Sequence, residues 1–292
     1  MLDLLGVSSS GYYDYINRKD RGPTKTQVKR EEIKDRIKEI HAESREIYGA
    51  PKITHELRKE GYKVSEKTVG NHMREMGIRA HYVKPYTATT IDSSVDQTLE
   101  NILDRDFNPE VPNAYWCSDI TYIWTGEEGF VYLTSVMDLF SRKIIAWEIS
   151  KTLEAESVLR CIDMAIKRRR GVKPKIFHTD RGSQFVSSLY YFKLGSDVTT
   201  SYSRTANPWD NACMESFHAL IKREWLDRFE ILNLEHARLL VFEYIDAFYN
   251  TKRIHSHCGY MSPNDFEAKQ LAEEEQKTNN NDIEPATLTW VS

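Results

Sequence analysis

Three acidic residues occupy positions where an acid has little structural reason to be. Asp119 lies within an aromatic and β-branched run that predicts a strand, Asp180 ends another such run, and Glu215 lies within a predicted helix. A charge in a strand or on an apolar helix face is costly unless it is paired or binds a metal. Two hard cations about 4 Å apart, held by carboxylates, support phosphodiester cleavage. The three acids are therefore candidate catalytic metal ligands.

For each acid taken alone, a structural role remains open. Asp180 would then begin an Asp-Arg-Gly turn, Asp119 would pair with an arginine, and Glu215 would be solvated. The combination favours the metal site, with 60 residues between Asp119 and Asp180 and 34 between Asp180 and Glu215. Asn211, Glu215 and Lys222 recur at i, i+4 and i+11, which is one helix face. Lys222 is therefore predicted to contact the DNA phosphates beside the metal ligands.

Four further side chains near these acids are candidate nucleic-acid contacts. Arg181 and Arg204 are predicted to bind phosphate, with a salt bridge to a nearby acid as the alternative. His178 is predicted to support the acids or contact the reacting phosphate, with a strand-capping role as the alternative. Trp209, just before the helix of Glu215, is predicted to stack on a DNA base.

The elements that must position these residues form a mixed α/β sheet. Alternating aromatic and β-branched residues predict the strands, and apolar residues at helical spacing predict the helices. The predicted strands are 115–124, 130–138, 143–150 and 175–179. The predicted helices are 154–170, 207–228 and 234–249. Hairpin-linked strands followed by a helix and a further strand indicate an α/β fold.

A small all-α domain precedes this sheet. Ile33, Ile37 and Ile40 have helical spacing, and Ser65 can cap a later helix that runs to about residue 76. Short helices joined by a glycine-containing turn are typical of a helix-turn-helix-like unit, although small helical bundles share the pattern. On the last helix, Lys67 and Arg74 are candidate DNA contacts.

The composition and charge distribution bound the remaining function classes. Hydrophobic residues make up 40% and charged residues 29%, and no apolar run is long enough to span a membrane. The four cysteines form no C-x-x-C pair, which disfavours a zinc cluster or a disulfide framework and favours the cytoplasm. The net charge of −4 belongs to the acidic tail, so it does not argue against DNA binding by the rest.

Six segments are expected along the chain. They are a lead-in (1–24), a helix-turn-helix-like DNA-binding domain (25–79), a linker (80–112), an α/β catalytic core (113–228), a C-terminal helical extension (229–269) and an acidic, disordered tail (270–292).

Several strings resemble the insertion-sequence three family of bacterial transposases. They are LGVS with GYY near the start, HTDRGSQF at 178–185, SR and WDNA within 203–212, MESF at 214–217, and YNTKRIHSH with GYMSP within 249–263. The resemblance covers about residues 4–267. Asp119, Asp180 and Glu215 then correspond to the DDE triad of retroviral-integrase-like transposases.

The resemblance implies an RNase H-like core, a five-stranded mixed sheet flanked by helices with the first acid on the first strand. It also implies two Mg²⁺ or Mn²⁺ ions, cleavage of double-stranded DNA at the element ends, and strand transfer by a 3′-hydroxyl without a covalent protein–DNA intermediate. The chain departs from the family in two places. The family usually has 35 residues between the second and third acids, a shortfall expected here in residues 193–200, and Thr179 replaces a serine.

The family also implies partners. A homo-oligomer, at least a dimer, is expected to hold two element ends with their inverted repeats and the target DNA. The protein begins where the family's downstream reading frame begins, so fusion or association with an upstream-frame product is expected. Two alternatives remain open from the sequence: a stand-alone RNase H-like nuclease, and an inactive or regulatory end-binding protein.

Overall fold

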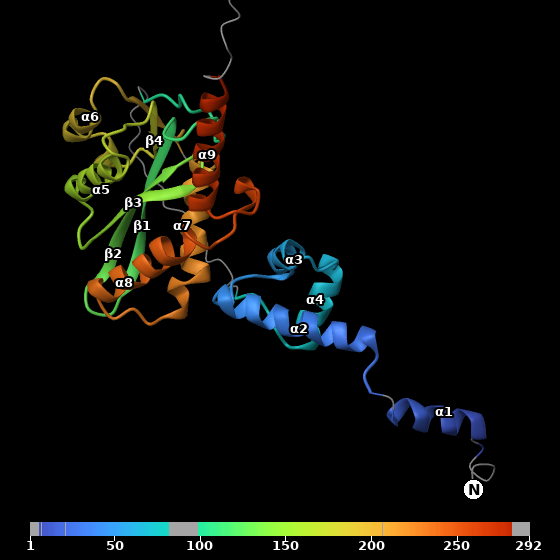
Figure 1. The fold of residues 1–292 in the computed structure, drawn as a ribbon. Helices are drawn as coiled ribbons and strands as arrows, with labels where there is room; N and C mark the ends of the chain where they lie inside the picture. Colours follow the sequence, from blue (N-terminus) through green and yellow to red (C-terminus); the bar gives the residue numbers. More distant parts are fainter. Residues whose placement is uncertain (1–5, 7, 21, 82–98, 206, 282–292) are drawn as a thin grey trace, which may run out of the picture. The chain divides into compact units, whose positions relative to one another are not determined.

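The computed structural model describes residues 6, 8–20, 22–81, 99–205 and 207–281 of the chain (Figure 1). The chain divides into two compact units, Met1–His81 and Tyr82–Ser292. Among the described residues, none of the helices combines the length and the apolar character that crossing a bilayer requires.

The first unit is helical, as the sequence predicts. Its helices are α1 (Ser9–Asp20), α2 (Lys25–Glu43), α3 (Ala50–Lys59) and α4 (Glu66–Glu75). Thr24 begins α2 with a capping box, and the Ser65 hydroxyl accepts a hydrogen bond from Thr68 N–H at the start of α4. Ile37, Ile53 and Val69 are buried between α2, α3 and α4, which therefore share one core.

A five-stranded mixed sheet forms the centre of the second unit. Its strands are β1 (Tyr115–Thr125), β2 (Gly129–Asp138), β3 (Lys143–Ser150), β4 (Ile176–Thr179) and β5 (Thr199–Tyr202), in the order β3-β2-β1-β4-β5. The first three pair antiparallel through hairpins, whereas β4 pairs parallel with both β1 and β5. The predicted fold class is confirmed. The family resemblance implied a fifth strand, but the residue patterns located neither β5 nor the helix before it.

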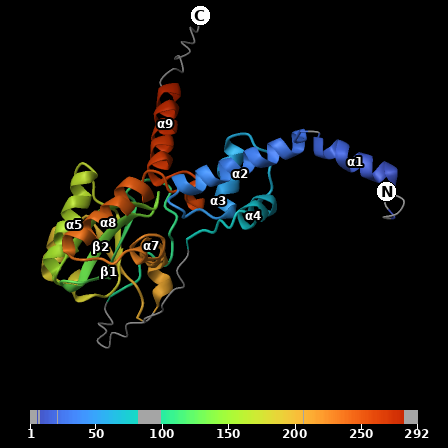
Figure 2. The same cartoon turned by 90° about the horizontal axis from the view of Figure 1, so that it is seen from below.

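Helices cover both faces of this sheet. In both views, α5 (Ala155–Arg168) and α7 (Ala212–Glu224) lie on opposite sides of it (Figures 1 and 2). On the α5 side, Trp116, Phe177 and Cys161 are fully buried in one core with residues of α6 (Ser188–Leu194). Because side chains alternate along a strand, Asp119 points to the other face, toward α7.

Part of the predicted linker belongs to the second unit. Residues 82–98 lie outside the described residues, but 99–112 pack on the sheet. Leu103 is buried and its N–H donates to Ser201 Oγ at 2.9 Å, while Tyr202 N–H donates to the Glu100 carbonyl. The prediction of a linker up to residue 112 is wrong here, because this segment satisfies the open edge of β5.

Two helix predictions also need correction. The helix expected from residue 207 begins as the 3₁₀ turn η3 (Pro208–Asn211), and α7 itself starts at Ala212. The tail expected to be disordered from residue 270 instead continues α9 (Pro263–Asn281), since charged residues such as Lys269 and Glu273 pair one turn apart. Residues 282–292 of that tail lie outside the described residues.

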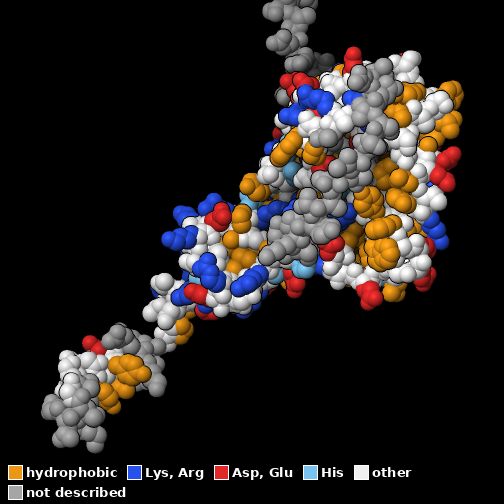
Figure 3. Space-filling model, turned by 180° about the vertical axis from the view of Figure 1, so that it is seen from behind, with side chains coloured by type: hydrophobic (Ala, Val, Ile, Leu, Met, Phe, Trp, Pro, Cys, Tyr) orange, Lys and Arg blue, Asp and Glu red, His pale blue; other side chains and the backbone are white. Residues whose placement is uncertain are grey.

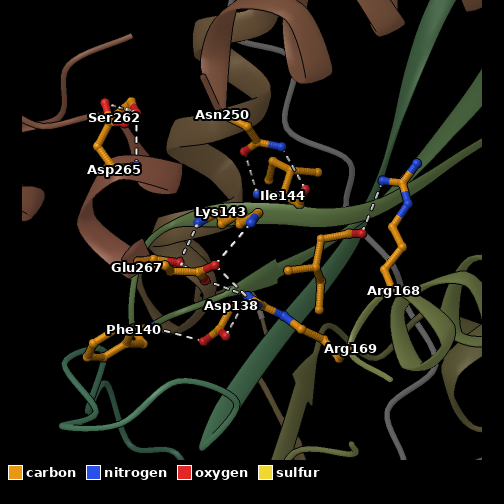
Figure 4. Close-up of polar contacts among 12 residues, drawn as sticks. Asp138, Phe140, Lys143, Ile144, Arg168, Arg169, Asn250, Ser262, Asp265 and Glu267 are labelled. Carbon is orange, nitrogen blue, oxygen red and sulfur yellow. Dashed lines mark hydrogen bonds and ion pairs between the residues drawn. The ribbon is translucent and has the colours of Figure 1, made fainter. Parts of the chain in front are cut away.

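An ion-pair network fastens α9 to the sheet (Figure 4). Glu267 of α9 lies between Arg169, with Nη2–Oε1 at 2.6 Å, and Lys143, with Nζ–Oε2 at 3.0 Å, and it also accepts from Ser141 Oγ. Arg169 Nη2 also lies 2.9 Å from Asp138 Oδ2. Burial raises the pKa of Asp138 to about 6 although Arg169 opposes it. Every acid of this network therefore has a cationic partner.

The side-chain amide of Asn250 pairs with the backbone of the edge strand β3. Ile144 N–H donates to Asn250 Oδ1 at 3.0 Å, and Asn250 Nδ2 donates to the Ile144 carbonyl at 2.9 Å (Figure 4). Asn250 follows α8 (Leu234–Tyr244) and the π-helical turn η5 (Ile245–Tyr249), where one helix was predicted. The side chain thus satisfies the exposed backbone of an edge strand as a neighbouring strand would.

Candidate active site

Asp119 and Asp180 lie beside each other because their strands are parallel. The last registered pair of β1 and β4 is Cys117 with His178, and each acid follows two residues later. Neighbouring strands are about 4.8 Å apart, so the two acids share one edge region and one face of the sheet. The pairing of β1 with β4 therefore brings Asp119 and Asp180 near each other, although 60 residues separate them in the sequence.

The turn after β4 fixes Asp180. Its Oδ1 accepts a hydrogen bond from Gly182 N–H at 3.0 Å, and the residue is exposed. A Cβ on Gly182 would lie 3.1 Å from Asp180 Oδ1 and 3.0 Å from Gln184 Oε1, so only glycine leaves the carboxylate this space. Asp180 therefore does begin the Asp-Arg-Gly turn that the sequence left open.

Glu215 reaches the same site from the first turn of α7. Burial raises its pKa, the negative charge of Asp119 raises it further, and His218 opposes both. The charge of Asp119 therefore acts on Glu215, and His218, one turn further along α7, offsets only part of its effect.

His218 is a member of the site that the sequence reasoning missed. Its Nδ1 lies 3.3 Å from Asp119 Oδ2, and its side chain is buried. His218 follows Glu215 by three residues on α7, hence on the same helix face. That spacing is the signal that would have found it.

The oxygen atoms at the site are of the kind that binds a hard cation, but the acidic side chains do not converge on one point. Within the described residues, no three His, Cys, Asp or Glu side chains are arranged to hold a metal ion. Asn211 Nδ2 donates to the Ser118 carbonyl at 3.3 Å, while its buried Oδ1 has no hydrogen-bond partner in this part of the chain. Carboxylate and amide oxygens are ligands that Mg²⁺ accepts, and its charge would offset the repulsion between Asp119 and Glu215.

Lys222 lies at the border of the site, two turns along α7 from Glu215. Its Nζ is 5.4 Å from the centre of the Tyr122 ring on β1. Burial lowers the pKa of Lys222, while Asp227 and Asp119 oppose this shift. Glu215 and Lys222 therefore lie two turns apart on α7, whereas Asn211 lies in the 3₁₀ turn before it, and contact of Lys222 with DNA stays a prediction.

Family models match both units. Integrase core domain models match residues 109–215 and 196–263, and an HTH-like domain model matches residues 29–86. The transposase InsF for insertion sequence IS3A of Escherichia coli (strain K12) is 37% identical over 273 residues, which are 93% of this chain and 94% of that protein. The chain belongs to the IS3 family of insertion-sequence transposases.

A second transposase relative agrees with this assignment. The transposase for insertion sequence element IS904 of Lactococcus lactis subsp. lactis (strain IL1403) is 37% identical over 248 residues, 85% of this chain and 98% of that protein. Among solved structures, the catalytic core domain of BIV integrase is 17% identical and covers 56% of this chain and 99% of its own, with a TM-score of 0.42. The resemblance found in the sequence motifs is confirmed by the transposase relatives.

Asp210 organises the loop that leads to Glu215 in this transposase, a role that sequence reasoning missed. Asp210 is fully buried, and its carboxylate accepts from Arg204 N and Nε at 2.9 and 2.8 Å and from Arg105 Nε at 2.7 Å. Burial would raise the pKa of Asp210, but these donors hold it far below its usual range. The adjacent Trp209 is 71% exposed.

The predicted contacts around the triad fare differently. Arg204 forms the salt bridge that was its alternative, with Asp210. The Arg181 guanidinium donates to the Ser203 and Leu99 carbonyls.

The prediction that His178 contacts DNA is wrong, because β4 is an interior strand and His178 is fully buried between Ser201 and Ser203 Oγ, at 2.9 and 3.1 Å. Burial lowers the pKa of His178 to about 4, so the ring is neutral.

The helix-turn-helix-like unit of the transposase exposes the two side chains chosen from its sequence. Lys67 and Arg74 lie on the exposed face of α4, and Asn71 lies between them. Arg74 Nη1 donates to Asn71 Oδ1 at 3.0 Å, which keeps the two polar groups together. Their contact with DNA stays a prediction.

Proposed function

We propose that this transposase cuts double-stranded DNA at the ends of its insertion sequence and joins the resulting 3′-hydroxyls to target DNA in the cytoplasm. Asp119, Asp180 and Glu215 would hold the divalent ions, Mg²⁺ or Mn²⁺, two per site. The geometry that supports this proposal is the contact of His218 Nδ1 with Asp119 Oδ2 at 3.3 Å, one turn after Glu215 on α7, together with the register that places Asp180 one strand away from Asp119. When bound, such ions make a hydroxyl more acidic and stabilise a departing oxygen.

The residues of the chain have separate tasks around that chemistry. His218 Nδ1 lies against Asp119 Oδ2, and Asp119 Oδ1 accepts a hydrogen bond from Ile120 N–H at 2.8 Å, so both oxygens of this carboxylate are oriented. Asn211 contributes a buried oxygen that lacks a donor within the described residues. Lys222 supplies a positive charge for the phosphate of the DNA that the acids face.

Asp180 must turn to complete the ligand set. Its carboxylate is exposed and its Oδ1 accepts a hydrogen bond from Gly182 N–H at 3.0 Å, so a change of side-chain rotamer would direct it toward the bound ion. An exposed hydrogen bond contributes only about 1 kcal/mol, far less than the attraction of a carboxylate to a divalent cation. In this proposal, Asp180 completes the ligand set when the ion binds.

The remaining DNA contacts follow the element ends. Lys67 and Arg74 of the first unit would read or hold the inverted repeats, while Arg181 and Trp209 would contact DNA beside the cut. Two ends must be held at once for transposition, so the active form is at least a dimer. Fusion or association with an upstream-frame product would supply further DNA binding.

The test is a cleavage and joining reaction. A labelled duplex with the element end is incubated with Mg²⁺ and the full chain, and products are resolved by length. Joined products longer than the substrate are expected for the wild type and for Glu235→Gln, an exposed glutamate of α8 used as a matched control. Glu215→Gln should give none. Shortened products alone would indicate a nuclease, and binding without any product would indicate a regulatory protein.

A further inference from the structure

Beyond Asp119, the β1–β2 hairpin carries four aromatic residues on one face. Tyr122 pairs directly with Tyr132, and Trp124 pairs with Phe130. The ring centres are 6.5 Å apart in the first pair, 4.9 Å in the second, and 5.8 Å from Tyr122 to Phe130. These four residues form a continuous cross-strand aromatic ladder.

Three side chains of the aromatic ladder are exposed to solvent. Tyr122, Trp124 and Phe130 are 44%, 62% and 54% exposed. On the opposite face of the same strands, Ile123 and Val131 are buried. Hydrophobic side chains gather on the surface of the second unit in the view from behind (Figure 3). An exposed apolar cluster of this size marks an interaction surface.

The position of α5 explains why the ladder is not part of the core. Trp116 lies on the same face of β1 as Tyr122 and Trp124, six residues before Tyr122, and is fully buried under α5 and α6. The helices therefore cover this face at the start of β1 and leave it uncovered toward the hairpin turn. The exposed rings are a consequence of where the helices end.

The surroundings of the ladder favour nucleic acid over a second protein. Lys222 Nζ lies 5.4 Å from the Tyr122 ring centre, so a cation borders the aromatic surface. Tyr122 follows Asp119 by three residues, about 10 Å along the strand, so the two side chains leave opposite faces of β1, and Lys222 of α7, the helix on the Asp119 side, reaches the Tyr122 ring. Lysine is depleted from protein–protein interfaces, whereas aromatic rings beside a cation are typical of surfaces that bind single-stranded nucleic acid.

We propose that the aromatic ladder stacks on unpaired bases of the DNA strand whose phosphate reacts at Asp119 and Glu215. This inference rests on the proposed function, because it assigns a further contact to the same DNA substrate. Bases inside a duplex stack on one another and leave no free face, so the ladder selects a strand that has been opened next to the cut.

The test compares two DNA probes with the full chain in the absence of divalent cations. One probe is a blunt duplex, and the other is the same duplex with a short unpaired arm that carries one 2-aminopurine. Trp124→Leu and Phe130→Leu should each weaken binding of the forked probe about 5- to 100-fold and reduce the quenching of 2-aminopurine. Binding of the blunt duplex should be unchanged.

Matched variants separate stacking from general apolar contact. Trp124→Phe keeps an aromatic ring and should retain most of the preference for the forked probe. Phe242→Leu makes the same substitution as Phe130→Leu at a residue of α8 that is 51% exposed, and should bind both probes as the wild type does. Equal fork preference in Trp124→Leu and the wild type would overturn the proposal.

Two further measurements separate failure of the stacking proposal from failure of the proposed catalytic function. Asp119→Asn should keep the fork preference while it loses cleavage, so absent cleavage in the wild type with retained fork preference contradicts the proposed function alone. Sedimentation of Trp124→Leu supplies the other readout. Loss of a dimer without loss of affinity for the forked probe would assign the ladder to a second copy of the chain and overturn the proposal.

Discussion

Two clusters of acids lie on the same β-hairpin, and they differ in how their charges are balanced. Asp138 is opposite Trp116 in the register of β1 and β2, and Asp119 is opposite Ser135, three pairs further along. The cluster around Asp138 contains Arg169 and Lys143 beside its acids. In the cluster around Asp119, the nearest acid raises the pKa of Glu215.

This difference separates an acid cluster that holds the fold from one that can hold a ligand. Burial would raise the pKa of Glu267, but hydrogen bonds and charge from Arg169 bring it below its usual value. Glu215, by contrast, has a raised pKa, because burial and the charge of Asp119 raise it and His218 offsets only part of their effect. The first cluster is complete without a ligand, and the second has an unmet need for positive charge.

The largest effect is expected for loss of an active-site carboxylate. Asp119→Asn should reduce cleavage and strand transfer about 1,000-fold or more, since removal of even an indirect partner of a metal ligand costs about 10–100-fold. Single-turnover rates on a pre-formed element end measure this. A variant that retained a tenth of the wild-type rate would remove Asp119 from the ligand set.

The compensated cluster should respond in stability instead. Arg169→Leu leaves Asp138 and Glu267 buried without their shared cation, which should lower the free energy of unfolding by about 3–5 kcal/mol. Urea unfolding followed by tryptophan fluorescence measures the second unit, because all six tryptophans lie beyond residue 81. As a control, Arg160→Leu removes an exposed ion pair with Glu148 and should lower the free energy of unfolding by less than about 1 kcal/mol.

The same variant has a predictable dependence on pH. The pKa of Asp138, about 6, lies above its unfolded value of 3.8, so this carboxyl contributes stability at acid pH that is lost as the pH rises through about 6. Without Arg169 that loss grows. The destabilisation by Arg169→Leu should therefore be larger at about pH 8 than at about pH 5, and the reverse order would contradict the assigned role of the arginine.

Divalent cations should stabilise the uncompensated cluster alone. At about 100 times the dissociation constant, Mg²⁺ or Mn²⁺ should raise the free energy of unfolding by about 2.7 kcal/mol. Asp119→Asn should lose this increment and Glu267→Gln should keep it. Because the pKa of Glu215 is raised, protons compete with the cation, so more cation should be needed as the pH falls. Equal stabilisation of both variants would place the cation elsewhere.

The strands and the candidate ligands were within reach of sequence reasoning, since both leave local patterns. Aromatic and β-branched runs mark β1 to β3, and acids such as Asp119 interrupt those patterns where a core residue is expected. The roles of Asp210 and His218 leave no such mark. Each depends on a partner roughly a hundred residues away, Arg105 and Asp119, and only the fold brings these partners together.

Burial was the other property that the local sequence does not reveal. His178 stands beside a candidate ligand and looks like a functional histidine, yet its strand lies between β1 and β5 and is covered on both faces. The short strand β5 was missed because four residues give too little periodicity to recognise. Residues 99–112 were assigned to a linker for the same reason, although they pack on that strand.

The smallest effect on stability is expected when the same substitution, glutamate to glutamine, is made once in each of the two acid clusters. Without cations, Glu267→Gln should destabilise the second unit by about 1.5–3 kcal/mol, as it removes the charge bound by Arg169 and Lys143. Glu215→Gln should leave stability unchanged or raise it by less than about 1 kcal/mol. Its raised pKa means that the folded state disfavours the ionised form, and solvent screens most of this cost at an exposed residue. Equal destabilisation by the two glutamine variants in urea titrations would show that both clusters serve the fold.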